Sequence, residues 1–139
     1  RFLSLQKSRC TKLGIKYIKR VIGLPGDKIE IKGYQIYING KKLEQILQPK
    51  KEEASLFIES SGDKEYIIRT LGISEYENFS WIIPSGKFLA IGDNRDNSLD
   101  SRAWGYFSKE HLIGKGEFIW LHWSSFTDIP TFNRNKRIN

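Results

Sequence analysis

Two short segments of this chain place lysine, serine, aspartate and arginine where they could do chemistry. The first is Tyr17-Ile-Lys-Arg-Val-Ile-Gly-Leu-Pro-Gly-Asp27, and the second is Gly92-Asp-Asn-Arg-Asp-Asn-Ser-Leu-Asp-Ser-Arg-Ala-Trp-Gly105. A lysine with its ordinary pKa of about 10.4 is protonated at neutral pH and cannot take a proton from a serine hydroxyl. Burial lowers the pKa of a lysine because it disfavours the charged form. Lys19 is therefore either a desolvated general base or a solvated charge on a strand.

The second segment holds the groups that could fix such a base in place. Its aspartates alternate with arginines, which suits short ion pairs within a loop; they are Asp93, Arg95, Asp96, Asp100 and Arg102. Alternation along a strand points Arg20 to the side opposite Lys19, so that Arg20 needs an anion of its own. We expect this anion to be Asp93. The alternative interpretation is a turn in which the aspartates and arginines of this segment pair only with one another and support no base.

Together, the two segments resemble the lysine-bearing and Asp/Ser/Arg-rich boxes of type I signal peptidases, also called bacterial leader peptidases. The likeness covers about 15–33 and 80–123 of the chain. It implies a serine endopeptidase with a Ser/Lys dyad that removes signal peptides from secreted preproteins after small side chains, without cofactor or metal. It further implies that Lys19 is the general base and that Ser98 hydrogen-bonds it. Supporting roles carry over to Asp93, Asp100, Arg102 and Arg20.

The family keeps its nucleophilic serine in a Ser-Met-x-Pro segment, and no such segment occurs in this chain. Ser4 and Ser8 are the serines that precede Lys19, and neither stands in a similar context. The chain also has no methionine and begins with arginine. We therefore expect a processed, truncated or split piece of a longer protein. The sequence holds no recognisable nucleophile, and we predict that these 139 residues are inactive alone.

Hydrophobic periodicity and turn residues predict a mainly β chain. Strands are expected at 15–22, 28–32, 35–39, 65–71, 80–83, 87–91 and 116–123, with a short further strand near 41–43. Pro84-Ser-Gly86 predicts a hairpin between two of them. One helical turn capped by Ser108 is expected at 108–113. Residues 44–64 show a broken apolar pattern and predict a looser excursion with room for one short element.

The resemblance implies several coiled antiparallel sheets with a small β insertion. We expect a core domain from 15–33 and 80–126, an inserted subdomain at 34–79, and poorly ordered tails at 1–14 and 127–139. The apolar runs are far shorter than the about 20 residues that span a bilayer. The resemblance places catalysis at the outer, periplasmic face of the bacterial cytoplasmic membrane.

A net charge of +7 attracts polyanions, either nucleic acid or anionic lipid headgroups. The resemblance favours the anionic membrane surface as a partner, besides secretory preproteins, and disfavours nucleic acid. Three alternatives remain: another Ser/Lys peptidase of the self-cleaving repressor type, a split remnant without function, and a basic module that stacks single-stranded nucleic acid. The aromatic side chains for such stacking would be Tyr34, Tyr37, Trp120 and Trp123.

Metal and thiol chemistry are not indicated. The single Cys10 excludes an internal disulfide and a multi-cysteine zinc site. The acidic loop fails the calcium-loop pattern counted from Asp93, because Arg95 stands at a ligand position and Trp104 at that of the bidentate glutamate. His111 and His122 lie in no metal-binding or triad-like pattern.

Overall fold

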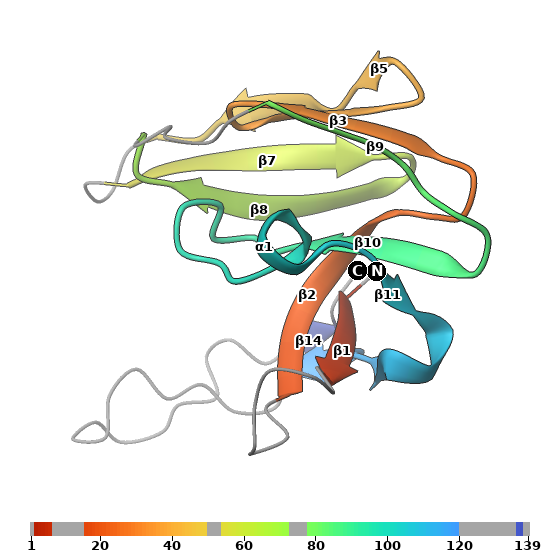
Figure 1. Ribbon diagram of the computed structural model, residues 1–139. Coiled ribbons are helices and arrows are strands. Elements are labelled where there is room, and N and C mark those ends of the chain that lie inside the picture. Colours follow the sequence, from red (N-terminus) through yellow and green to blue (C-terminus); the bar gives the residue numbers. More distant parts are fainter. Residues whose placement is uncertain (1, 7–15, 50–53, 73–77, 120–135, 138–139) are drawn as a thin grey trace.

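The computed structural model describes residues 2–6, 16–49, 54–72, 78–119 and 136–137. Within these ranges the strands form sheets of five, four, three and two strands, and almost all pairings are antiparallel (Figure 1). The four- and three-stranded sheets lie in the upper part of Figure 1, and β2 runs from them into the lower part. The expected mainly β architecture with several antiparallel sheets is confirmed.

The five-stranded sheet carries the lysine and leads into the Asp/Ser/Arg segment. Its order is β11 (Phe107–Ser108), β10 (Lys87–Ile91), β2 (Lys16–Gly23), β1 (Phe2–Gln6) and β12 (Leu112–Lys115). The register pairs Arg20 with Ile91, so the end of β10 lies beside the middle of β2. Strand β1 falls within the expected N-terminal tail, and the absence of a sustained apolar period there concealed it.

The four-stranded sheet contains the predicted meander. Its order is β5 (Lys41–Lys42), β4 (Gln35–Ile38), β3 (Lys28–Lys32) and β9 (Phe79–Ile82). The predicted hairpin between β9 and β10 is wrong, because β9 pairs with β3 whereas β10 pairs with β2 and β11. Pro84 and Lys87 do form a turn hydrogen bond of 3.1 Å, but the turn leads the chain from one sheet to another.

The three-stranded sheet was not predicted for 44–64. It consists of β6 (Glu44–Leu47), β7 (Ser55–Ser61) and β8 (Lys64–Thr70), of which only β8 was expected. The reason is physical: β7 buries the charged Glu59 completely, so its inward face does not read as apolar in the sequence. Strands β4 and β5 lie in the sheet of β3, whereas β6–β8 form a sheet of their own; the division into core and insertion at residue 34 stays a prediction.

An aliphatic core joins the five-stranded and four-stranded sheets. Its buried members are Ile22, Ile29, Ile31, Ile36, Leu43, Ile83, Leu89 and Ile91. Fully burying such a side chain stabilises the fold by about 1.5–3 kcal/mol. Since these residues lie on β2, β3, β4, β9–β10 and their junctions, the core fixes the end of β10 relative to β2.

The remaining elements are short. Helix α1 (Ser101–Trp104) follows the Asp/Ser/Arg loop, and a 3₁₀ turn, Lys109–His111, replaces the helical turn expected at 108–113. Ser108 makes no capping hydrogen bond; its Oγ accepts one from Lys87 Nζ at 2.6 Å instead. Strand β13 (Phe118–Ile119) pairs with β14 (Lys136–Arg137), and the rest of the expected closing strand lies outside the described residues. None of the helices in the described ranges is long and apolar enough to cross a membrane.

Candidate active site

Lys19 and Ser98 are far apart in the sequence and in contact in the structure. The Nζ of Lys19 donates a hydrogen bond of 2.6 Å to the Oγ of Ser98, 79 residues further on. Desolvation lowers the pKa of Lys19 from 10.5, and Arg102 lowers it further, whereas Asp100 and Asp93 act in the opposite direction. The expected Lys19–Ser98 contact is present, and burial lowers the pKa of the Lys19 amine.

Gly92 makes this contact possible. It is buried at the end of β10, and a Cβ built there would lie 1.9 Å from Ser98 Oγ and 3.3 Å from Lys19 Nζ. Contacts of this kind below 3.0 Å require something to move. Only glycine at this position therefore lets the serine reach the lysine.

Asp100 organises the loop that carries Ser98. It is fully buried, and its carboxylate accepts hydrogen bonds from the Gly92 N–H at 2.9 Å and from the Arg102 guanidinium at 2.7 and 2.9 Å. It also caps α1 by accepting from the Arg102 N–H. Burial by itself would raise the pKa of Asp100, but hydrogen bonds and charge from Arg102, with hydrogen bonds from Gly92 and Ser98, bring it below 3.8.

Ser101 fixes the same loop through a second hydrogen bond to the backbone of β10. Its Oγ accepts a hydrogen bond of 2.9 Å from the N–H of Ala90, and its side chain is buried. Together with the Asp100–Gly92 bond, this contact fastens the loop to two backbone N–H groups at the end of β10. The position of Ser98 is thus set by the sheet.

Arg20 and Asp93 form the predicted ion pair. Arg20 Nε and Nη2 each donate a 3.0 Å hydrogen bond to one oxygen of the Asp93 carboxylate. The Arg20 side chain is 3% exposed and that of Asp93 is 24% exposed, so water reaches the pair only from the Asp93 side. Because Arg20 follows Lys19 and Asp93 follows Gly92, the pair ties together the two backbone segments that form the site.

The loop's other arginine, Arg95, points away from Lys19. It is buried and pairs with Glu59 of β7, whose carboxylate also accepts from the hydroxyl of Tyr66 on β8. Glu59 and Tyr66 come from the three-stranded sheet and were not predicted to belong near the site. The only signal for Glu59 in the sequence was a charged residue directly after the short apolar run 56–58.

The six proposed site residues therefore lie together: Lys19, Arg20, Asp93, Ser98, Asp100 and Arg102. Sequence reasoning missed the roles of Gly92, Ser101, Glu59 and Tyr66. Ser8, Cys10, His122, Trp120 and Trp123 lie outside the described residues, and of Ser4 only the backbone pairings with Ile18 and Gly114 are described. Within the described ranges, no cluster of His, Cys, Asp or Glu is suited to a metal ion.

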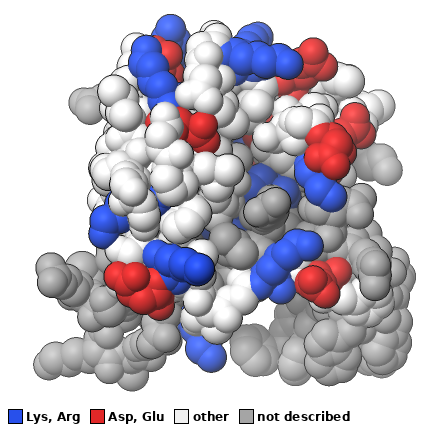
Figure 2. Space-filling view, turned by 90° about the vertical axis from the view of Figure 1, so that its right-hand side faces the viewer, with Lys and Arg blue, Asp and Glu red and all other residues white. Residues whose placement is uncertain are grey.

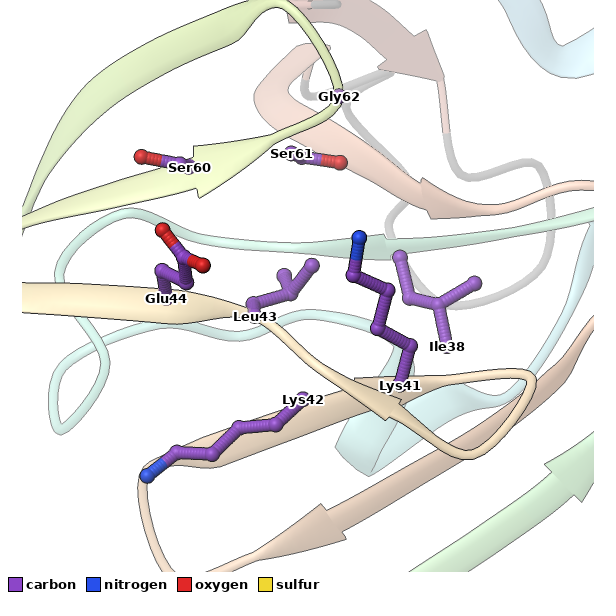
Figure 3. Close-up of a pocket in the computed structure, with 8 residues that line it drawn as sticks. All are labelled: Ile38, Lys41, Lys42, Leu43, Glu44, Ser60, Ser61 and Gly62. Atoms are coloured by element: carbon purple, nitrogen blue, oxygen red, sulfur yellow. The ribbon is translucent and has the colours of Figure 1, made fainter.

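A surface pocket is lined by residues other than those of the site. This pocket of about 410 Å³ is lined by Ile38, Lys41, Lys42, Leu43, Glu44, Ser60, Ser61 and Gly62. Figure 3 shows Lys41 extending into it while Lys42 points away. On the face shown in Figure 2, the described basic side chains are interspersed with acidic ones. None of the residues that line the pocket is a member of the lysine site.

The family model described as "Signal peptidase, peptidase S26" matches residues 6–123, which include both segments of the site. The chain belongs to the S26 signal peptidase family. It is 40% identical over 116 residues to signal peptidase IB of Staphylococcus aureus strain Mu50, covering 79% of this chain and 56% of that protein. It is 34% identical over 140 aligned positions to signal peptidase I of Pseudomonas aeruginosa, covering 86% of this chain and 49% of that protein.

The solved structure of a signal peptidase I from Enterococcus faecalis V583 has the same fold. The TM-score is 0.53 at 22% identity, over 82% of this chain and 91% of that one. This likeness confirms the signal-peptidase architecture expected from the sequence. The chain spans about half the length of the curated relatives it matches. The S26 family consists of serine peptidases, so its members need a nucleophile beside the lysine.

Proposed function

We propose that this chain forms the general-base part of a type I signal peptidase, a serine endopeptidase that removes N-terminal signal peptides from secreted preproteins. The observation that carries the proposal is the Lys19–Ser98 hydrogen bond of 2.6 Å in a partly desolvated site. A lysine whose pKa is lowered by burial is what proton abstraction from a serine hydroxyl requires. Family membership and the relatives named signal peptidase I support it.

The arrangement around Ser98 prepares Lys19 for this task. Ser98 gives a hydrogen bond to Asp100 and accepts one from Lys19 Nζ, so its single hydroxyl proton is already committed. A neutral Lys19 amine then donates one N–H to the Ser98 Oγ, and its lone pair remains available to accept a proton. That lone pair takes the proton of the nucleophilic serine while the serine Oγ attacks the scissile carbonyl carbon.

The later steps reuse the same proton. The lysine ammonium gives it to the leaving amine nitrogen as the C–N bond breaks, which leaves an acyl-enzyme. A water molecule then attacks the acyl carbon and passes a proton to the regenerated amine; as the ester bond to the serine Oγ breaks, the ammonium returns that proton to the Oγ, which restores the serine hydroxyl and releases the acid product. Asp100 and Asp93 stabilise the transient ammonium, because both raise the pKa of Lys19 relative to burial alone.

The nucleophilic serine of this proposal is not among these 139 residues, since no Ser-Met-x-Pro segment occurs in them. It would come from a segment beyond this sequence. The proposed substrates are secretory preproteins with small side chains before the cleavage site. The proposed place of action is the outer, periplasmic face of the bacterial cytoplasmic membrane, next to anionic lipid that the net charge of +7 would favour.

The proposal is tested first in the coding DNA that precedes Arg1. An in-frame Ser-Met-x-Pro segment should be present, and the polypeptide that includes it should cleave a preprotein in vitro. Lys19→Ala in that polypeptide should abolish cleavage, whereas Lys16→Ala, an exposed lysine on the same strand, should leave it unchanged. The 139-residue polypeptide alone should be inactive. Cleavage that survives Lys19→Ala would refute the proposed role.

A further inference from the structure

The three-stranded sheet is hydrogen-bonded directly to the loop of the site. The N–H of Arg69 on β8 donates to the carbonyl of Asp93, and the N–H of Arg95 donates to the carbonyl of Arg69, both at 2.8 Å. These bonds form a parallel bridge between Arg69 and Asn94. Figure 1 shows β8 lying beside the loop that leads from β10 to α1. The edge of β8 therefore sets the backbone path of the loop.

Glu59 is a buried anion surrounded by donors. Its carboxylate accepts hydrogen bonds from both Nη atoms of Arg95, from the Tyr66 hydroxyl at 2.8 Å and from Gln45 Nε2 at 2.7 Å. The Arg95 side chain is 3% exposed and that of Glu59 is fully buried. Removing one member of such a pair leaves the other as an uncompensated buried charge. Glu59 is therefore needed to keep Arg95 in place.

Tyr66 links the Glu59–Arg95 pair to the Arg20–Asp93 pair. Its hydroxyl donates to Glu59, and its ring lies under the guanidinium of Arg20 at 3.4 Å. Arg20 in turn holds the carboxylate of Asp93. A ring in this position attracts the cation and excludes water from it. One residue of β8 thus contacts both the Glu59–Arg95 and the Arg20–Asp93 ion pairs.

We propose that Glu59 and Tyr66 are positioning residues for the Lys19 site, which act through the Arg95 and Arg20 ion pairs. Asp93 is covalently joined to Gly92, whose close approach determines where Ser98 and Lys19 meet. Release of Arg95 or Arg20 displaces Asp93 and its backbone, and Gly92 moves with them. The three-stranded sheet that carries Glu59 and Tyr66 would then be a structural part of the catalytic site. The inference rests on the proposed function of Lys19.

The test measures the titration of Lys19 itself, which needs neither a nucleophile nor a substrate. In the 139-residue chain, the pH dependence of the Lys19 Nζ resonance is followed by NMR in the parent protein and in Glu59→Gln and Tyr66→Phe. Glu65→Gln is the matched control, since it makes the same change at an exposed position of β8. The charged groups that act on Lys19 from its surroundings, Asp93, Asp100 and Arg102, are present in every variant.

Glu59→Gln should raise the pKa of Lys19 toward its ordinary value, because a displaced loop lets water reach the amine. Tyr66→Phe keeps the ring under Arg20 and loses only the hydroxyl, so it should shift the pKa in the same direction by less. Glu65→Gln should shift nothing. An unchanged Lys19 titration in both variants would overturn the proposal. A further fall of the pKa would also overturn it, because Glu59 would then act by its charge through space.

Fold loss and failure of the proposed function give different results. A Glu59→Gln protein without dispersed amide resonances has not folded, and Tyr66→Phe then decides the question. If Lys19 of the parent chain titrates with the pKa of an ordinary lysine, the proposed function fails. If its pKa is lower and the variants have the same pKa, only the present inference fails.

In a polypeptide that includes the nucleophile, Glu59→Gln should lower kcat about tenfold with little change in KM, and raise the apparent pKa of the rate profile.

Discussion

Gly92 and Ser98 are in such close contact that a Cβ on Gly92 would lie 1.9 Å from the Ser98 Oγ. Gly92→Ala should therefore push Ser98 away from Lys19 and reduce peptidase activity by at least about a hundredfold, since small misplacements at a reacting centre have effects of this size. Gly114→Ala is the control, because among the described residues no atom beyond its chain neighbours lies within 4 Å of a Cβ built there. Full activity of Gly92→Ala would show that the contact is dispensable.

Ser98→Ala should impair catalysis without preventing folding. The variant loses the acceptor that orients Lys19 Nζ and the donor that serves Asp100. Two hydrogen bonds of about 0.5–1.5 kcal/mol each correspond to a fall in kcat of about tenfold to a hundredfold. Ser85→Ala, at an exposed turn position, should have no effect. The measurement is cleavage of a preprotein by the polypeptide that includes the nucleophile.

The rate should rise with pH as Lys19 loses its proton. Because burial lowers the pKa of Lys19 below 10.5, the rise should occur at lower pH than for an ordinary lysine. The folded protein binds fewer protons than the unfolded chain between the two pKa values, so stability should also increase with pH in that range. A rate profile that follows an ordinary lysine would contradict the assignment of Lys19 as base.

Asp100 should make the fold sensitive to acid. Its pKa is lower in the folded protein than the ordinary 3.8, so its stabilising effect is complete above that pH and is lost as the pH falls through the folded value. Asp100→Asn should weaken the pairing with Arg102 and cost about 3–5 kcal/mol of unfolding free energy at neutral pH. The cost should shrink in acid, as measured by urea unfolding at two pH values.

Asp63→Asn, in the exposed turn between β7 and β8, is the control for this experiment. It should change the free energy of unfolding by less than about 0.5 kcal/mol at either pH. An Asp100→Asn protein as stable as this control would mean that the buried pair contributes nothing to the fold.

The sequence allowed the local elements of the site to be predicted, because they have local causes. Alternation identified β3 and β4, and β-branched and aromatic residues identified β2. The alternation of side chains along β2 suggested the Arg20–Asp93 pair, and the family resemblance placed Lys19 beside Ser98. Each of these contacts is present in the structure. The steric role of Gly92 could not be read from its neighbours in sequence, since it depends on the side chains of two other segments.

What the sequence concealed depends on tertiary pairing. Strand β7 looked irregular because Glu59 is buried, and its partner Arg95 comes from the loop between β10 and α1. The β9–β10 hairpin failed for a similar reason: Pro84 and Gly86 form a turn, but the aliphatic core assigns the flanking strands to different sheets. Turn residues predict a change of chain direction, but they do not determine with which strand the chain pairs after the turn.

The separation of 79 residues between Lys19 and Ser98 bears on the order of folding. The contacts of β7 with β8 close a loop of a few residues and can form early, whereas the lysine–serine contact requires the intervening chain to be arranged first. The edge of β8 is then available to bind the Asp93–Arg95 backbone as it arrives. We therefore expect the basic amine to remain hydrated, and chemically inert, until the last stage of folding, so that an incompletely folded chain carries no active base.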